Sequence, residues 1–127
     1  MQLSAFAAVG FGAVLGAWAR WGLGAALNAV VPNLPLGTLV ANLLGGYLVG
    51  VTVAQLETVA GVAPEVRLFV ITGFLGALTT FSTFSAEAVS LLHTARYGWF
   101  FAHTAMHLFG SLGMTVLGLE TVRLLRG

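Results

Sequence analysis

The stretch that decides how this chain is organised runs from Gly73 to Ser85 and reads Gly73-Phe74-Leu75-Gly76-Ala77-Leu78-Thr79-Thr80-Phe81-Ser82-Thr83-Phe84-Ser85. It lies inside a run from Leu68 to Ala86 that carries no charge and is long enough to cross the hydrocarbon core of a bilayer. Its centre nevertheless holds a cluster of hydroxyl side chains. Polar groups at that depth are expensive unless they face protein or a water-filled path. The stretch therefore predicts the lining of a path rather than a lipid-facing surface.

The composition of the whole chain predicts a membrane protein. Of its 127 residues, 58% are hydrophobic and 7% are charged, whereas soluble domains carry about 25% charged residues. The chain has no cysteine, which excludes a disulfide framework and a thiolate site. A net charge of +1 gives no indication of nucleic-acid binding.

Uncharged runs predict four transmembrane helices, and the runs are too long and too irregular in polarity for strands. We expect them at about residues 3–31, 36–56, 68–93 and 97–119. Pro32, Asn33 and Pro35 predict a turn after the first helix, and residues 57–67 a polar connector before the third. The sequence thus predicts an all-α membrane protein with a single four-helix transmembrane channel domain over residues 1–127.

The third helix is predicted to be broken near its centre. Gly73 and Gly76 precede Thr79 and Thr80, and threonine hydroxyls compete for backbone carbonyls within a helix. We therefore expect a break at about residues 78–80. Non-helical backbone at this depth is tolerated only where protein or water covers it.

The charges around the predicted spans give only a weak orientation signal. Arg67, Arg123 and Arg126 fall on one side of the membrane, and Arg96, with Arg20 as a further candidate, on the other. Because loop arginines set orientation, so small a bias allows insertion both ways round. Subunits of opposite orientation can then pair antiparallel, which would help a thin four-helix wall to enclose a polar path.

Two glycine pairs predict close helix packing. Gly12 and Gly16, and likewise Gly46 and Gly50, are spaced one turn apart, which lets two backbones approach closely. The spacing does not distinguish packing within a subunit from packing between subunits.

Phe81, Phe84 and Asn42 are the candidate contacts for a small anion. The edge of a phenylalanine ring is positive, and conduction requires sites that are favourable but weak. Plain core packing is the alternative for the two rings. Asn42 can donate to an anion or cross-link two helices, and Thr38 lies one turn before it on the same face.

The remaining polar residues of the spans leave several interpretations open. Arg20 either reaches to the membrane interface or attracts anions at a vestibule, and Glu87 is expected near an interface. His103, His107 and Ser111 form one stripe on the last span. Two histidines at this spacing can bind a metal, but no acidic or thiol ligand accompanies them on that span, so a face toward the polar path or toward another helix is the preferred interpretation.

Three segments of this chain resemble the Fluc/CrcB fluoride channel family. They are Gly12-xxx-Gly16-Ala17-xx-Arg20-Trp21, Gly37-Thr38-Leu39-xx-Asn42-xx-Gly45 and Gly73-xx-Gly76-xx-Thr79-Thr80-Phe81-Ser82-Thr83-Phe84-Ser85. The resemblance covers nearly the whole chain, although Trp21 stands where the family more often has tyrosine and the last span matches loosely.

The resemblance implies a passive, selective fluoride channel that exports fluoride as a dual-topology antiparallel homodimer in a bilayer, with the bacterial inner membrane as the expected location. It implies that fluoride passes the ring edges of Phe81 and Phe84. The polar wall and vestibule implied by the family comprise Asn42, Thr38, Ser82, Thr83, Ser85, His107, Ser111, Arg20 and Glu87. It further implies a structural sodium ion at the dimer centre, held by the backbone carbonyls of Gly76 and Thr79.

Two other functions remain as alternatives at this point. A proton-coupled small multidrug-type exporter would need a central carboxylate in the first span, which carries Arg20 and no acid. A non-conducting membrane subunit would explain the glycines but not the hydroxyl and phenylalanine cluster. We do not expect an enzyme, because the two histidines of the last span have no partnered nucleophile.

Overall fold

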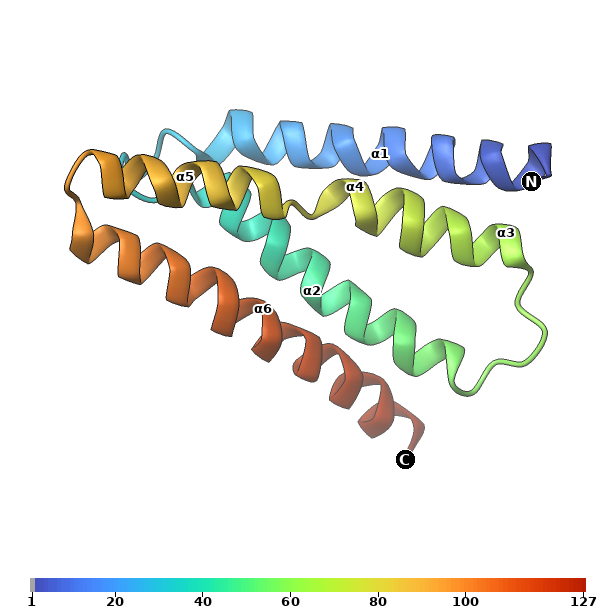
Figure 1. Ribbon diagram of the computed structural model, residues 1–127. Coiled ribbons are helices and arrows are strands. Elements are labelled where there is room, and N and C mark those ends of the chain that lie inside the picture. The colour runs from blue at the N-terminus through green and yellow to red at the C-terminus, as the bar shows by residue number, and fades with distance from the viewer. Residues whose placement is uncertain (1) are drawn as a thin grey trace.

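The computed structural model describes residues 2–127, and the regular structure of this range is helical. The first two helices are α1, Leu3–Leu27, and α2, Leu36–Leu56. The third transmembrane stretch consists of α3, Pro64–Arg67, η1, Leu68–Leu75, α4, Gly76–Leu78, and α5, Phe81–His93, and it is followed by α6, Tyr97–Arg126. Four helical stretches are long and apolar enough to cross a membrane, which confirms the prediction of four spanning helices (Figure 1).

The bounds differ from the predicted ones at three places. The first helix ends at Leu27, and the Asn28 side chain that follows it accepts a hydrogen bond from the Thr38 backbone N–H at 3.1 Å. Residues 64–67 are helical instead of part of the connector, as suits a proline in the first turn. The last helix continues to Arg126, whose guanidinium donates to the Ala54 carbonyl at 3.2 Å.

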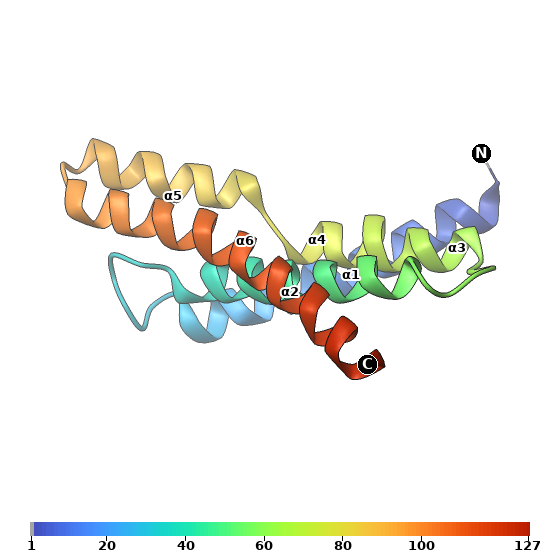
Figure 2. The same cartoon turned by 90° about the horizontal axis from the view of Figure 1, so that it is seen from below.

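The predicted break in the third span is present. Thr79 has φ −87° and ψ 154°, and Thr80 has φ −150° and ψ 116°, so both are extended between two helical segments. Figures 1 and 2 show α4 and α5 joined by this short extended link with a slight bend. The segment before the break, η1, is a π-helix, a widened form that the sequence did not predict and that often occurs at functional sites.

The glycine pairs bring helices together within one subunit. α1 packs mainly along η1 and α4, and α2 along α6, as the two ribbon views show (Figure 2). A Cβ on Gly16 would lie 2.2 Å from the Phe74 carbonyl oxygen, and one on Gly50 would lie 2.1 Å from that of Thr115. Side chains at these positions would force the backbones apart. The sequence left open whether the glycine pairs pack within a subunit or between subunits, and the structure shows them packing within the subunit.

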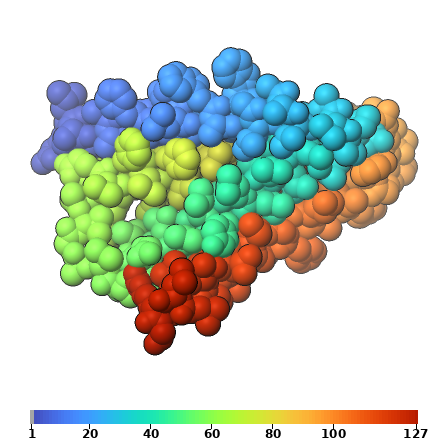
Figure 3. All heavy atoms as spheres, turned by 180° about the vertical axis from the view of Figure 1, so that it is seen from behind, coloured from blue at the N-terminus to red at the C-terminus, as the bar shows by residue number. Residues whose placement is uncertain are grey.

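The core is small and the outer surface is apolar. Ala41, Leu75 and Leu78 form the buried core, while large apolar side chains on the outside, such as Phe11 and Trp21, are 70% and 75% exposed. Such a surface suits lipid rather than water. The space-filling view shows α1 along one edge and a hollow near the place where the chain passes from α2 toward η1 (Figure 3).

Candidate functional site

A cavity of about 560 Å³ lies beside the break in the third span, between α2, α5 and α6. Seven of the sequence-predicted residues line it: Asn42, Thr79, Phe81, Phe84, His107 and Ser111, together with Thr80 from the decisive stretch. Within residues 2–127, the predicted hydroxyl residues Thr38, Ser82, Thr83 and Ser85 are not part of its lining. The structure therefore gathers the aromatic and amide groups at the break and leaves most of the proposed hydroxyl track outside this cavity.

Asn42 holds the extended link in place. The Thr80 backbone N–H donates to Asn42 Oδ1 at 2.7 Å, and Asn42 Nδ2 donates to the Thr80 carbonyl at 3.0 Å. The same Nδ2 lies 3.1 Å from His107 Nδ1. One amide therefore replaces the hydrogen bonds that an unbroken helix would have given Thr80, and it ties α2 to both α5 and α6.

The hydroxyls of the link bind backbone groups near it. Thr80 Oγ1 accepts from the Thr83 N–H at 3.1 Å and caps the N-terminus of α5, and it lies 3.3 Å from Ser82 Oγ. Thr79 Oγ1 donates to the Leu75 carbonyl at 2.9 Å. The Thr79 and Thr80 hydroxyls are thus engaged in local hydrogen bonds to the backbone, which was the alternative to lining a path.

The two phenylalanines differ in their surroundings. The Phe81 ring is 80% exposed, and its centre lies 5.4 Å from that of Phe84 at an interplanar angle of 48°. Phe84 is stacked on His103 at 5.2 Å and tilted against His107 at 5.0 Å. The Phe84 ring is thus fixed by two imidazoles, whereas Phe81 projects from the subunit with most of its surface uncovered.

Arg20 bonds to the other side of the break. Its Nε donates to the Ala77 carbonyl at 2.9 Å, so a positive group sits at the C-terminal end of α4, where the helix dipole favours it. The structure therefore gives Arg20 a structural contact at the break, and its vestibule role stays a prediction.

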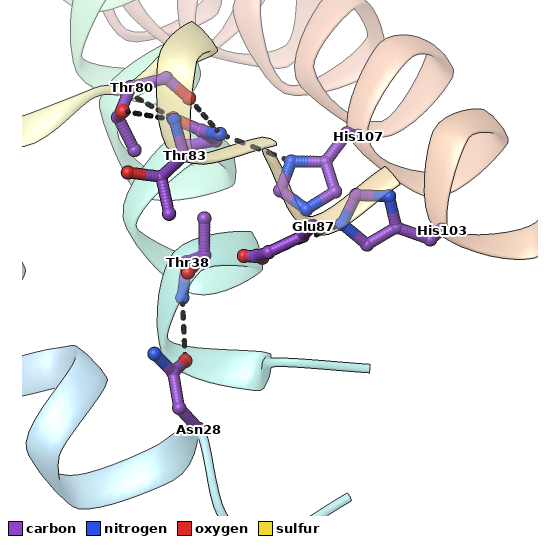
Figure 4. A network of polar contacts seen from close by, with 8 residues as sticks. Asn28, Thr38, Thr80, Thr83, Glu87, His103 and His107 are labelled. Atoms are coloured by element: carbon purple, nitrogen blue, oxygen red, sulfur yellow. Dashed lines mark hydrogen bonds and ion pairs between the residues drawn. The ribbon is translucent and has the colours of Figure 1, made fainter. Parts of the chain in front are cut away.

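A cluster of titratable side chains lies next to the cavity. His103 Nε2 is 3.5 Å from Glu87 Oε1, and the His103 side chain is fully buried. One ligand atom from each of Glu87, His103 and His107 falls within 4.8 Å of the others, as the close-up shows (Figure 4). The acidic partner that the last span lacks is therefore supplied by α5. The spacing of residues along one helix cannot reveal a partner that comes from another helix. Glu87 also lines a second cavity of about 360 Å³ near Arg96.

Two polar lining residues were not predicted from the sequence. Thr115 and Thr104 both face the main cavity, and Thr115 Oγ1 donates to the Gly46 carbonyl at 3.0 Å. Thr115 continues the stripe of His107 and Ser111 by one more turn, so the spacing carried a signal for it. Thr104 Oγ1 is buried without a hydrogen-bond partner, and no pattern in the sequence singles it out.

Comparisons with known proteins agree with these observations. The family model described as "CrcB-like protein, Camphor Resistance (CrcB)" matches residues 7–119. A protein of Cupriavidus necator named "Fluoride-specific ion channel FluC" is 59% identical over 94% of this chain and 95% of its own length. Proteins of the same name from Nitrosospira multiformis and Pseudomonas putida are 56% and 51% identical, over 97% and 99% of this chain and 96% and 99% of their own lengths. With matches that run nearly from end to end, this chain belongs to the CrcB-like protein family.

Proposed function

We propose that this chain forms a passive fluoride-selective ion channel that exports fluoride and so relieves its toxicity. The observation that carries the proposal is the cavity at the break, where Phe81, Phe84 and Asn42 meet in a chain with four membrane-spanning helices. The names of its close relatives support the choice of ion. No catalytic step enters this proposal.

Weak, directional contacts suit a small anion in such a cavity. The positive edges of Phe81 and Phe84 attract it without the strong trapping that a full positive charge would cause. Donors such as the Thr104 hydroxyl and the His107 ring, which line the cavity, replace part of the hydration shell. Thr38, Ser82, Thr83 and Ser85 remain candidates for a hydroxyl track outside the cavity, with Arg20 and Glu87 as vestibule residues.

The membrane potential is sufficient to drive export. Hydrogen fluoride is a neutral weak acid that crosses bilayers and ionises in a near-neutral cell, where the anion is retained. Moving one charge through the membrane potential is worth about 2.3 kcal/mol per 100 mV. A passive path therefore expels fluoride from a negative interior, and the bacterial inner membrane is the location that fits this role.

The conducting unit in this proposal is an antiparallel homodimer of dual-topology subunits. Phe81 is 80% exposed in the single subunit, and a second copy would cover it and close the cavity. The weak arginine bias around the spans allows both orientations. An exporter of the small multidrug type is not favoured, because α1 contains Arg20 and no acidic residue.

A structural sodium ion fits the backbone at the break. In an unbroken helix the Gly76 carbonyl would accept from the Thr80 N–H, but that N–H is bonded to Asn42. Gly76 is also exposed, so its carbonyl is accessible to a partner. Hard cations prefer oxygen ligands, and the Gly76 and Thr79 carbonyls of two subunits would hold sodium at the dimer centre. The ion would supply positive charge that links the two breaks.

Ring substitution tests the conduction path. Phe81→Ile keeps an apolar side chain but removes the polarised edge, so fluoride efflux from liposomes should slow by at least about tenfold, the effect of about 1.4 kcal/mol in a barrier. Phe11→Ile is the matched control, because Phe11 is a 70% exposed ring on α1. Unchanged efflux in Phe81→Ile would mean that the ring serves packing only.

Thiol labelling tests the dual topology. The chain has no cysteine, so Glu57→Cys introduces a single thiol at the exposed end of α2. In intact spheroplasts, a membrane-impermeant reagent should label one part of the population and leave the other part protected until lysis. Labelling of all molecules, or of none, would contradict insertion in two orientations.

A further inference from the structure

The orientation of the Asn42 amide is fixed by the backbone of Thr80. The Thr80 N–H can only donate, so the atom 2.7 Å from it must be the amide oxygen. The Thr80 carbonyl can only accept, so the atom 3.0 Å from it must be the amide nitrogen. An amide NH₂ has two protons and no free acceptor site. Asn42 therefore has one further proton to donate.

That second proton points to His107. Asn42 Nδ2 lies 3.1 Å from His107 Nδ1, and since the amide nitrogen cannot accept, Nδ1 must be the acceptor. A ring nitrogen that accepts carries no proton, so the neutral imidazole bears its proton on Nε2. The hydrogen bond made by one ring nitrogen thus sets the chemistry of the other.

His107 Nε2 is buried and has no hydrogen-bond partner, in a side chain that is 4% exposed. Figure 4 shows this nitrogen on the side of the ring that faces Glu87 and His103. We infer that Asn42 is a positioning residue that holds His107 as an Nε2–H donor, and that the cluster of Glu87, His103 and His107 is therefore not a metal site.

The geometry of the cluster alone would suggest a metal site. Glu87, His103 and His107 offer three ligand atoms close together, and His103 and His107 have the spacing of paired metal ligands on one helix face. Binding through His107 Nε2 requires a lone pair there, which moves the proton to Nδ1. The Nδ1–H would then face the Asn42 N–H, so the bond at 3.1 Å would become a contact between two donors.

The inference rests on the hydrogen bonds of Asn42 to Thr80 and on its contact with His107. The tautomer of His107 does not depend on transport. Failure of this inference and failure of the channel proposal are therefore distinguishable.

The experiment is nitrogen NMR of ¹⁵N-histidine-labelled, full-length protein in lipid. The chain has three histidines, and His93→Gln and His103→Gln assign the spectrum by elimination. In the wild type, His107 should show an unprotonated Nδ1 and a protonated Nε2. Asn42→Asp replaces the donor by an acceptor and should reverse the pattern to Nδ1–H. A wild-type Nδ1–H, or an unchanged tautomer in Asn42→Asp, would overturn the inference.

The matched control is Asn28→Asp, another amide-to-acid change. Asn28 accepts from Thr38 N–H, which a carboxylate does equally well, so the His107 pattern should stay as in the wild type. If Asn42→Asp does not fold, Asn42→Ala serves instead and should give a mixture of both tautomers; a pure Nε2–H form would overturn the role of Asn42. Added Co²⁺ should leave the His107 Nε2 resonance sharp. Broadening of this resonance by Co²⁺ would overturn the conclusion that the cluster is not a metal site.

Discussion

A single methyl group added at Gly45 should strain the break in the third span. A Cβ at this position would lie 2.2 Å from the Thr79 γ-methyl carbon, about 1.2 Å closer than ordinary van der Waals contact, which begins at 3.4 Å. Threonine is stiff about χ1, and the Thr79 hydroxyl is held by the Leu75 carbonyl at 2.9 Å. The clash therefore cannot be relieved by rotating the methyl away without losing that bond.

The size of the effect follows from these contacts. Overpacking costs about 1–3 kcal/mol, and replacing glycine by alanine in a helix returns about 0.8–1 kcal/mol. Gly45→Ala should thus lower the free energy of unfolding by up to about 2 kcal/mol relative to the wild type, and by about 1–3 kcal/mol relative to a glycine-to-alanine change that meets no clash. Thr79→Ser removes the clashing methyl, keeps the hydroxyl and costs at most ~0.8 kcal/mol by itself. The double variant Gly45→Ala/Thr79→Ser should be no less stable than Thr79→Ser alone.

The assay is unfolding of the purified protein by SDS in mixed micelles, followed by the fluorescence of its tryptophans. Gly113→Ala is the matched control, because a Cβ there meets nothing within 4 Å. The two single variants and the double variant form a cycle whose coupling isolates the contact between the added methyl group and Thr79. If Gly45→Ala is as stable as Gly113→Ala, or if Thr79→Ser does not rescue it, the described packing of α2 against the break is wrong.

Three further perturbations test the packing and the proposed ion. Gly50→Ala should be about 1–3 kcal/mol less stable than Gly113→Ala, because its Cβ would sit 2.1 Å from the Thr115 carbonyl oxygen. Equal stability of the two variants in SDS titration would refute close α2–α6 packing. Arg20→Gln should cost about 1.5–3 kcal/mol through the lost charged bond to the Ala77 carbonyl, and no loss in the same titration would show that this bond is unimportant. Exchange of sodium for a large organic cation should lower fluoride efflux severalfold, and an unchanged rate would count against a structural sodium ion.

The helices could be predicted from the sequence because the chain marks their ends. The second helix begins after Pro35 and ends before Glu57, and its predicted bounds agree with α2, Leu36–Leu56. The break was predictable because glycines and threonines gather at mid-membrane depth. The last helix extends further than expected. Its predicted end was the end of the uncharged run, but contacts beyond that point, such as that of Arg126 with Ala54, keep the charged end helical.

The relations between helices were less predictable. Helical spacing placed His107 and Ser111 on one face, but it does not say which helix packs against that face. The contact of Glu87 with His103 and the bonding of Asn42 to Thr80 join residues on different helices, and only the three-dimensional arrangement reveals them. The choice between glycine packing within and between subunits was undecided for the same reason.

The most direct test of the central claim is ion release from liposomes containing only this purified protein. A potassium ionophore is added to vesicles loaded with fluoride and chloride to start anion efflux through the protein. Each anion is followed with its own electrode. The account predicts rapid release of fluoride while chloride stays almost entirely inside. Equal release of the two anions, or no release of fluoride, would contradict it.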